Sequence, residues 1–135
     1  RESAHIIADQ SRNVKSGSTD ALEAMHGIKH EALAMKECLL RGDFDGLVES
    51  MHLGWENKKR SAKTVSNPHI DAIYDAAIQA GALAGKVSGA GGGGFMWFFV
   101  PTEKRMDVIR TLNGFGGQVS NCHFTKLGTQ AWRIA

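Results

Sequence analysis

Residues 89–94 form the most unusual stretch of the chain, because five of the six are glycine. Lys86 and Ser88 precede this run, and the apolar residues 95–100 follow it directly. Each ordered glycine costs about 0.5–1 kcal/mol relative to alanine, and a tight hairpin needs only one or two of them. The surplus favours a loop whose backbone amides approach a ligand over a plain turn, since successive N–H groups can form an anion-binding concavity.

Two common phosphate-binding motifs do not explain the glycine run. Gly89, Gly91 and Gly94 have the spacing G-x-G-x-x-G, but that dinucleotide fingerprint requires a helix after it, whereas residues 95–100 read as a buried strand. The phosphate loop of nucleotide hydrolases is excluded as well, because no Gly-Lys-Ser or Gly-Lys-Thr closes the run. The sequence therefore predicts an anion-contacting loop between two strands.

Other chemistry-bearing residues give weaker signals. His26 and His30 are spaced to share a metal on one helix face, but "HGIKH" lacks the glutamate of a zinc-protease helix and a third ligand. A solvated helix face is the simpler interpretation, and we predict no metal ligands. Ser88 is not part of a G-x-S-x-G elbow, so no catalytic nucleophile is predicted.

Trp55 allows two interpretations. Helical spacing places it on one face with Lys58 and Lys59, so the indole and an ammonium could border a sugar or phosphate pocket. The alternative is a core tryptophan with its neighbouring cations in solvent. The sequence leaves both open.

The composition is that of one globular domain. The chain has 135 residues, of which 42% are apolar and 22% charged, as in ordinary soluble domains. A net charge of +2 with interspersed signs argues against a nucleic-acid partner. No segment reads as a membrane span or a signal peptide, so we expect a cytoplasmic protein. The opening "RESAHIIADQ" starts with the helical period already running, which is typical of a fragment of a longer protein.

The elements that must position the glycine loop follow from periodicity, caps and stops. Helices are predicted up to Gly17, over 18–42, from Asp43 through Trp55, over 67–81 and over 102–114. In the second helix, an apolar stripe from Ala21 to Leu39 is expected to face the core. Strands are predicted on both sides of the loop and again at 118–126 and 130–134. This order predicts an α+β domain with about four antiparallel strands and helices packed on one face of the sheet.

The stretch "GALAGKVSGAGGGGFMWFFV" resembles the third motif of the GHMP kinases, in which a Gly-Ala-Gly-Gly-Gly run lies between a Lys-containing strand and an apolar one. The segments "HLGWENKKR", "SNPHIDAIYDAAIQAGALAGK" and "FTKLGTQAWRI" are similar to the branch that phosphorylates the anomeric carbon of sugars. The likeness covers essentially residues 1–135, which would form the C-terminal, ferredoxin-like domain of such a kinase.

The resemblance implies a site and a reaction. The loop residues Gly89, Ala90, Gly91, Gly92 and Gly93 would lie beside the ATP phosphates and the phosphoryl acceptor, with Lys86 and Ser88 at the start of the loop. Arg1 matches an arginine that opens the first helix of this domain in the sugar-kinase branch. The implied substrates are ATP with Mg²⁺ and a sugar phosphate. The reaction would be phosphorylation of C1 of a heptose 7-phosphate, or alternatively of fucose or another small molecule.

The chain departs from the family in what it lacks. The Gly-Leu-Gly-Ser-Ser nucleotide loop, the substrate motif and the segment with a carboxylate near the acceptor are absent. The resemblance therefore implies a missing N-terminal kinase domain, and we expect the chain alone to be inactive. Two other classes stay open: a stand-alone module that binds small anions, and a scaffold for self-association.

Overall fold

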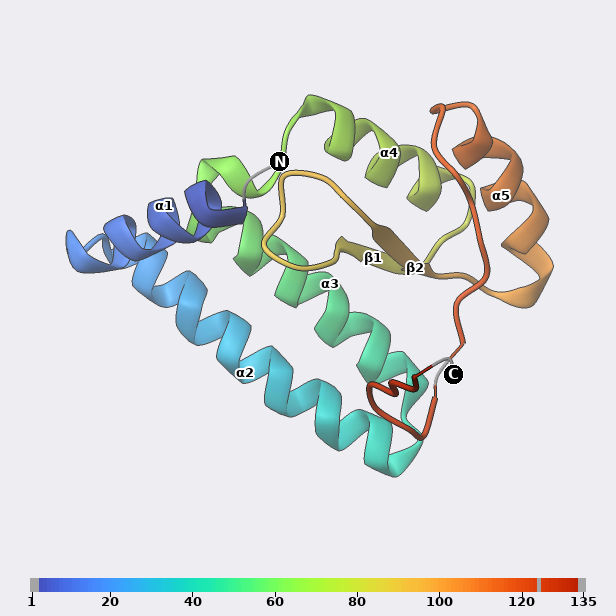
Figure 1. Ribbon diagram of the computed structural model, residues 1–135, viewed down its shortest axis with the longest axis horizontal. Helices are drawn as coiled ribbons and strands as arrows, with labels where there is room; N and C mark the ends of the chain where they lie inside the picture. The colour runs from blue at the N-terminus through green and yellow to red at the C-terminus, as the bar shows by residue number, and fades with distance from the viewer. Residues whose placement is uncertain (1–2, 124, 134–135) are drawn as a thin grey trace.

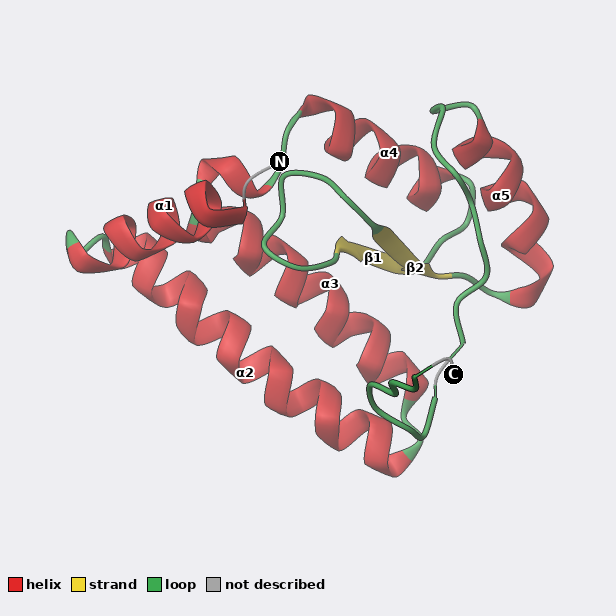
Figure 2. Ribbon diagram, in the orientation of Figure 1, coloured by secondary structure: helices red, strands yellow, loops and turns green. Residues whose placement is uncertain are grey.

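The computed structural model describes residues 3–123 and 125–133 (Figure 1). The elements are, in order, α1 (Ser3–Lys15), α2 (Thr19–Arg41), α3 (Phe44–Ser61), the 3-10 turn η1 (Lys63–Val65), α4 (Pro68–Gln79), β1 (Ala84–Val87), β2 (Met96–Phe99), the 3-10 turn η2 (Thr102–Lys104) and α5 (Arg105–Asn113). Helices thus form in all five predicted regions, and strands flank the glycine loop as predicted. Figure 2 shows the strand pair between α3 and α4.

Local sequence sets the helix ends. Ser18, Asp43 and Asn67 each accept a hydrogen bond from an amide of the first turn of α2, α3 and α4, and Asn67 does so at 3.1 Å from two amides. Pro68 stands at the first turn of α4, where its missing N–H costs nothing. Gly42 ends α2 with φ +71°, a left-handed cap that glycine adopts without strain. One residue later α3 is capped, so α2 and α3 form an antiparallel pair.

The face by which α2 packs differs from the predicted stripe. Its buried residues are Ala21, Ala24 and Glu31. Met25 and Leu39, which belong to the predicted stripe, are 39% and 55% exposed. Small residues let α2 and α3 approach closely, since a Cβ on Gly27 would lie 2.5 Å from the Asn57 side chain. The close approach of the two helices buries the face of α2 that carries small residues. The prediction from periodicity considered only the apolar residues and therefore chose a different face.

The sheet of the described residues is smaller than predicted. β1 and β2 pair antiparallel, with Ala84 opposite Phe99 and Val87 opposite Met96. The prediction of about four strands is not confirmed, because segments 118–123 and 125–133 contain no strand. Their side chains are exposed almost throughout, and an alternating segment with no buried face or paired edge has little to hold it extended.

The main core lies where α1, α3, η1, α4 and β1 meet. It contains Ile6, Trp55, Ala62, Val65, Ile70, Tyr74 and Val87. A smaller cluster of Ala77, Ala82 and Val108 joins α4 to α5, and Phe98 of β2 packs against both clusters. The strand that leads into the glycine loop is therefore anchored in the main core. Among the described helices, none combines the length and the hydropathy needed to cross a membrane.

Candidate functional site

The glycine loop connects β1 to β2 and is closed at its base. The amide of Ser88 donates to the carbonyl of Phe95 at 2.8 Å. Within the loop, all five glycines have positive φ, from +71° at Gly89 to +144° at Gly93. L-residues rarely adopt these conformations, so the backbone path itself requires the glycine run. A strand follows the loop, as predicted, which excludes the dinucleotide geometry.

One side of the loop rests on the protein. The amide of Gly92 donates to the carbonyl of Val65 at 2.7 Å. A Cβ on Gly91 would lie 2.7 Å from that same carbonyl oxygen, and a Cβ on Gly92 would lie 2.7 Å from Cδ1 of Ile6. η1 and α1 therefore support the middle of the loop.

The other side of the loop is open. A Cβ added to Gly89 or Gly94 would meet nothing within 4 Å. The Gly92 amide is used by Val65, but the amides of Gly89, Ala90, Gly91, Gly93 and Gly94 have no acceptor within the described part of the chain. Amides that lack an acceptor beside open space favour an anionic ligand.

Two ammonium groups reinforce this preference. Nζ of Lys58, on α3, donates a hydrogen bond to the carbonyl of Gly89. Lys86, on β1, is half-buried beside the loop, and within residues 3–123 and 125–133 no carboxylate pairs with either lysine. Burial, and then the charge of Lys86, lower the pKa of Lys58. Both effects disfavour the charged form of Lys58, and an anion bound nearby would act in the opposite direction.

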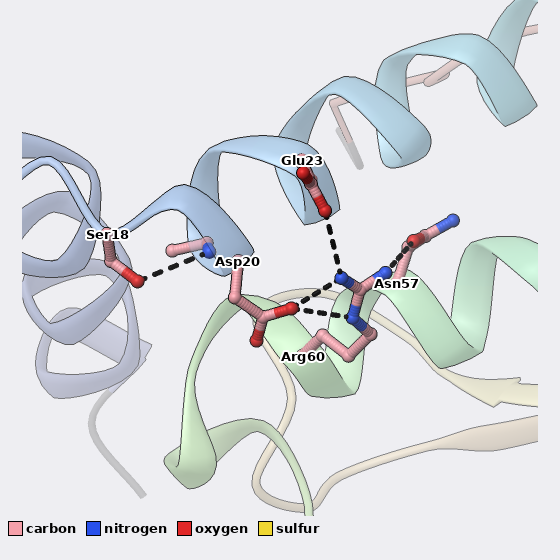
Figure 3. Close-up of polar contacts among 6 residues, drawn as sticks. Ser18, Asp20, Glu23, Asn57 and Arg60 are labelled. Atoms are coloured by element: carbon pink, nitrogen blue, oxygen red, sulfur yellow. Dashed lines mark hydrogen bonds and ion pairs between the residues drawn. The ribbon is translucent and has the colours of Figure 1, made fainter.

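The other cations of the run "NKKR" serve different contacts. Arg60 reaches across to α2, where it pairs with Asp20 and lies 3.5 Å from Oε2 of Glu23 (Figure 3). It also donates to Oδ1 of Asn57 at 3.4 Å. The hydrogen bond and charge of Asp20 raise the pKa of Arg60. These contacts tie the end of α3 to the start of α2, and none of them involves the loop.

Trp55 lies in the core and not at a pocket wall. Its side chain is 1% exposed, and its Nε1 has no hydrogen-bond partner within the described residues. Ala90 of the loop packs against the same cluster of buried residues. Nζ of Lys59 lies 5.8 Å from the ring centroids of both Trp55 and Tyr74 and pairs with Glu56 at 2.8 Å. Trp55 therefore belongs to the buried cluster on which the loop rests, and its ring does not face solvent.

The structure gathers most of the predicted site residues but not all of them. Lys58, Lys86, Ser88 and the loop residues 89–93 lie together, and Ser88 is exposed at the start of the loop. Arg1 lies outside the described residues. The contacts by which Ile6 and Val65 support the loop were not predicted. One is made by an apolar side chain and the other by a main-chain carbonyl, and no sequence motif indicates either.

Comparison with known proteins agrees with these observations. The profile of the family described as GHMP kinases C terminal matches residues 35–116. D-glycero-alpha-D-manno-heptose 7-phosphate kinase of Campylobacter jejuni is 44% identical over 126 residues, which are 93% of this chain and 37% of that protein. The chain thus spans little more than a third of this relative's length.

Two solved structures share the fold. One is a protein from Campylobacter jejuni assigned as a sugar kinase, with a TM-score of 0.62 and 47% identity over 84% of this chain and 34% of that one. The other is L. major mevalonate kinase in complex with R-mevalonate, with a TM-score of 0.74 over 84% of this chain and 35% of that one. At 20% identity the second likeness concerns the fold alone. With more than half of its residues matched by the family profile, the chain belongs to the GHMP kinases.

Proposed function

We propose that this chain is the C-terminal part of an ATP-dependent sugar kinase that phosphorylates the C1 hydroxyl of a heptose 7-phosphate. The observation that carries the proposal is the open glycine loop beside Lys58 and Lys86, in which the amides of Gly89, Ala90, Gly91, Gly93 and Gly94 have no acceptor among the described residues. Family membership and the 44% identity to a heptose 7-phosphate kinase support the reaction and the substrate class. We also place the reaction in the cytoplasm, where ATP and sugar phosphates are available.

The loop fits the demands of phosphoryl transfer. Little covalent chemistry is asked of the protein, because positioning and charge stabilisation supply most of the catalysis. The free amides of the loop would donate to phosphoryl oxygens, as an oxyanion hole does. Lys86 and the exposed Ser88 would border the transferred group at the start of the loop. The family resemblance adds Arg1 to the proposed binding residues.

The described residues fit phosphate better than they fit Mg²⁺. Among them, no group of three or more His, Cys, Asp or Glu side chains could hold a metal ion, whereas Mg²⁺ prefers carboxylates together with substrate phosphates. ATP, when bound, supplies the phosphoryl group. Among the described residues we name no ligand for Mg²⁺, whose coordination the phosphates of bound ATP would largely supply.

A direct assay tests the proposed function. The full-length natural protein, given ATP and heptose 7-phosphate, should release ADP and form an anomeric phosphate that ³¹P NMR detects. The isolated chain, which we expect to need an N-terminal domain, should form none. If the protein phosphorylates fucose in preference to the heptose, the proposed substrate is wrong and the alternative, a fucokinase-like enzyme, is correct. Absence of transfer to any sugar, with tripolyphosphate bound by the isolated chain, would favour a stand-alone anion-binding module instead.

We further propose that the complete domain has the predicted four-stranded sheet, with segments 118–123 and 125–133 pairing at its free edge. These segments expose Leu127 and Trp132, which are 66% and 79% exposed, and both strands of the described sheet have one unpaired edge. In the full-length protein, amides of these segments should exchange slowly with deuterium. Exchange as fast as in an unstructured peptide would show that they do not pair.

A further inference from the structure

Lys58 is the member of the run "NKKR" that faces the glycine loop. Lys59 lies over two aromatic rings and Arg60 reaches α2, whereas Nζ of Lys58 donates to the carbonyl of Gly89. The backbone beneath Lys58 is fixed, because Oγ of Ser61 donates to its carbonyl at 2.7 Å and Trp55, one turn earlier, is buried. The ammonium is thus presented to the loop from a rigid position.

A bond to the Gly89 carbonyl has a geometric consequence for the next amide. A trans peptide is planar, so the C=O of Gly89 and the N–H of Ala90 point in opposite directions. With the carbonyl turned toward Lys58 on α3, the Ala90 amide points away from α3. That amide is among those without an acceptor in the described part of the chain.

The loop is consequently held at two points. Lys58 holds the carbonyl of Gly89, and the carbonyl of Val65 holds the amide of Gly92. The residues between these points, Ala90 and Gly91, have little freedom to rotate their peptide planes. Without the first contact, Gly89, which has no Cβ, could leave its φ of +71° for other backbone conformations and so turn the Ala90 amide.

We propose that Lys58 is a positioning residue that aims the Ala90 amide at the phosphoryl group, a role that rests on the proposed kinase function. It acts mainly through the Gly89 peptide, and its ammonium makes no direct bond to the substrate. Misplacement of a reacting group by about 1 Å costs about a hundredfold in rate. Loss of the contact should therefore lower kcat and leave the KM values for ATP and sugar largely unchanged, since ground-state binding is not its task.

The test uses three variants of the full-length natural protein. Lys58→Met removes the ammonium, Lys58→Arg keeps a charged donor, and Lys63→Met removes an equal charge from an exposed residue of η1. We expect Lys58→Met to lose about a hundredfold in kcat, Lys58→Arg to recover most of the loss, and Lys63→Met to match the unmodified protein. A raised KM with unchanged kcat in Lys58→Met would overturn the positioning role, and so would unchanged kinetics.

A second readout does not depend on activity. In protein labelled with ¹⁵N-alanine, the amide resonance of Ala90 should move in Lys58→Met and stay in place in Lys63→Met. An unmoved resonance in Lys58→Met would overturn the proposal. If the unmodified protein transfers no phosphate while the resonance moves as expected, the kinase function fails and the loop contact of Lys58 stands.

Discussion

Gly91→Ala should abolish most of the kinase turnover of the full-length protein and also destabilise the chain. Gly91 has φ +118°, and its Cβ would lie 2.7 Å from the carbonyl oxygen and 3.0 Å from the Cα of Val65. Both neighbours are main-chain atoms that cannot rotate away. The loop must therefore lift from η1, which misaligns its amides, and loss of one such donor typically costs about 10²–10³ in kcat. Backbone strain of this kind costs about 1–3 kcal/mol of stability.

The matched control is Gly116→Ala. Gly116 has a similar requirement for positive φ, +74°, but a Cβ there would meet nothing within 4 Å, and it follows α5 far from the loop in sequence. Steady-state kinetics and urea unfolding of both variants separate the effects. Gly116→Ala should show only the small stability loss of a left-handed alanine, about 1–2 kcal/mol, with turnover unchanged. Comparable turnover in the two variants would contradict a catalytic role for the loop.

Trp55→Ala should give the largest loss of stability, about 3–5 kcal/mol. Trp55 is among the largest fully buried side chains and packs with residues of α1, η1, α4 and β1. Its removal leaves a cavity in the cluster against which Ala90 packs, so the support of the loop should weaken as well. Urea unfolding followed by far-UV circular dichroism measures the effect.

Trp55→Phe distinguishes packing from hydrogen bonding. Because Nε1 has no partner within the described residues, its loss should leave no polar group unsatisfied. Trp55→Phe should therefore cost clearly less than Trp55→Ala. An equal loss of stability in both variants would mean that the indole N–H matters more than the volume of the ring.

The sequence predicted the helices and the loop well because their signals are local. Caps such as Asn67 and stops such as Gly42 depend on a few neighbouring residues. The glycine run likewise indicates by its composition alone that the backbone there adopts conformations unfavourable to other residues. The buried face of α2 and the depth of Trp55 depend on which element packs alongside, which periodicity does not specify. The two strands expected after residue 117 depend on a distant partner edge, and the described residues show none of that pairing.

The candidate site could be predicted only as far as residue types reveal it. The sequence does not show which group each cation of a charged run contacts. Only the structure shows that Lys58 contacts the glycine loop, Lys59 lies over two aromatic rings and Arg60 pairs with α2. The same holds for the carbonyl of Val65, since every residue has one.

The seating of the loop on η1 and α1 bears on the thermodynamics of ligand binding. Fixing the backbone of one residue costs about 1–2 kcal/mol of conformational entropy, and here Gly91 and Gly92 are already confined by Val65 and Ile6. Much of that entropic cost is met during folding. A phosphate bound at the loop as proposed would therefore meet a preorganised receptor and retain more of its interaction energy as affinity.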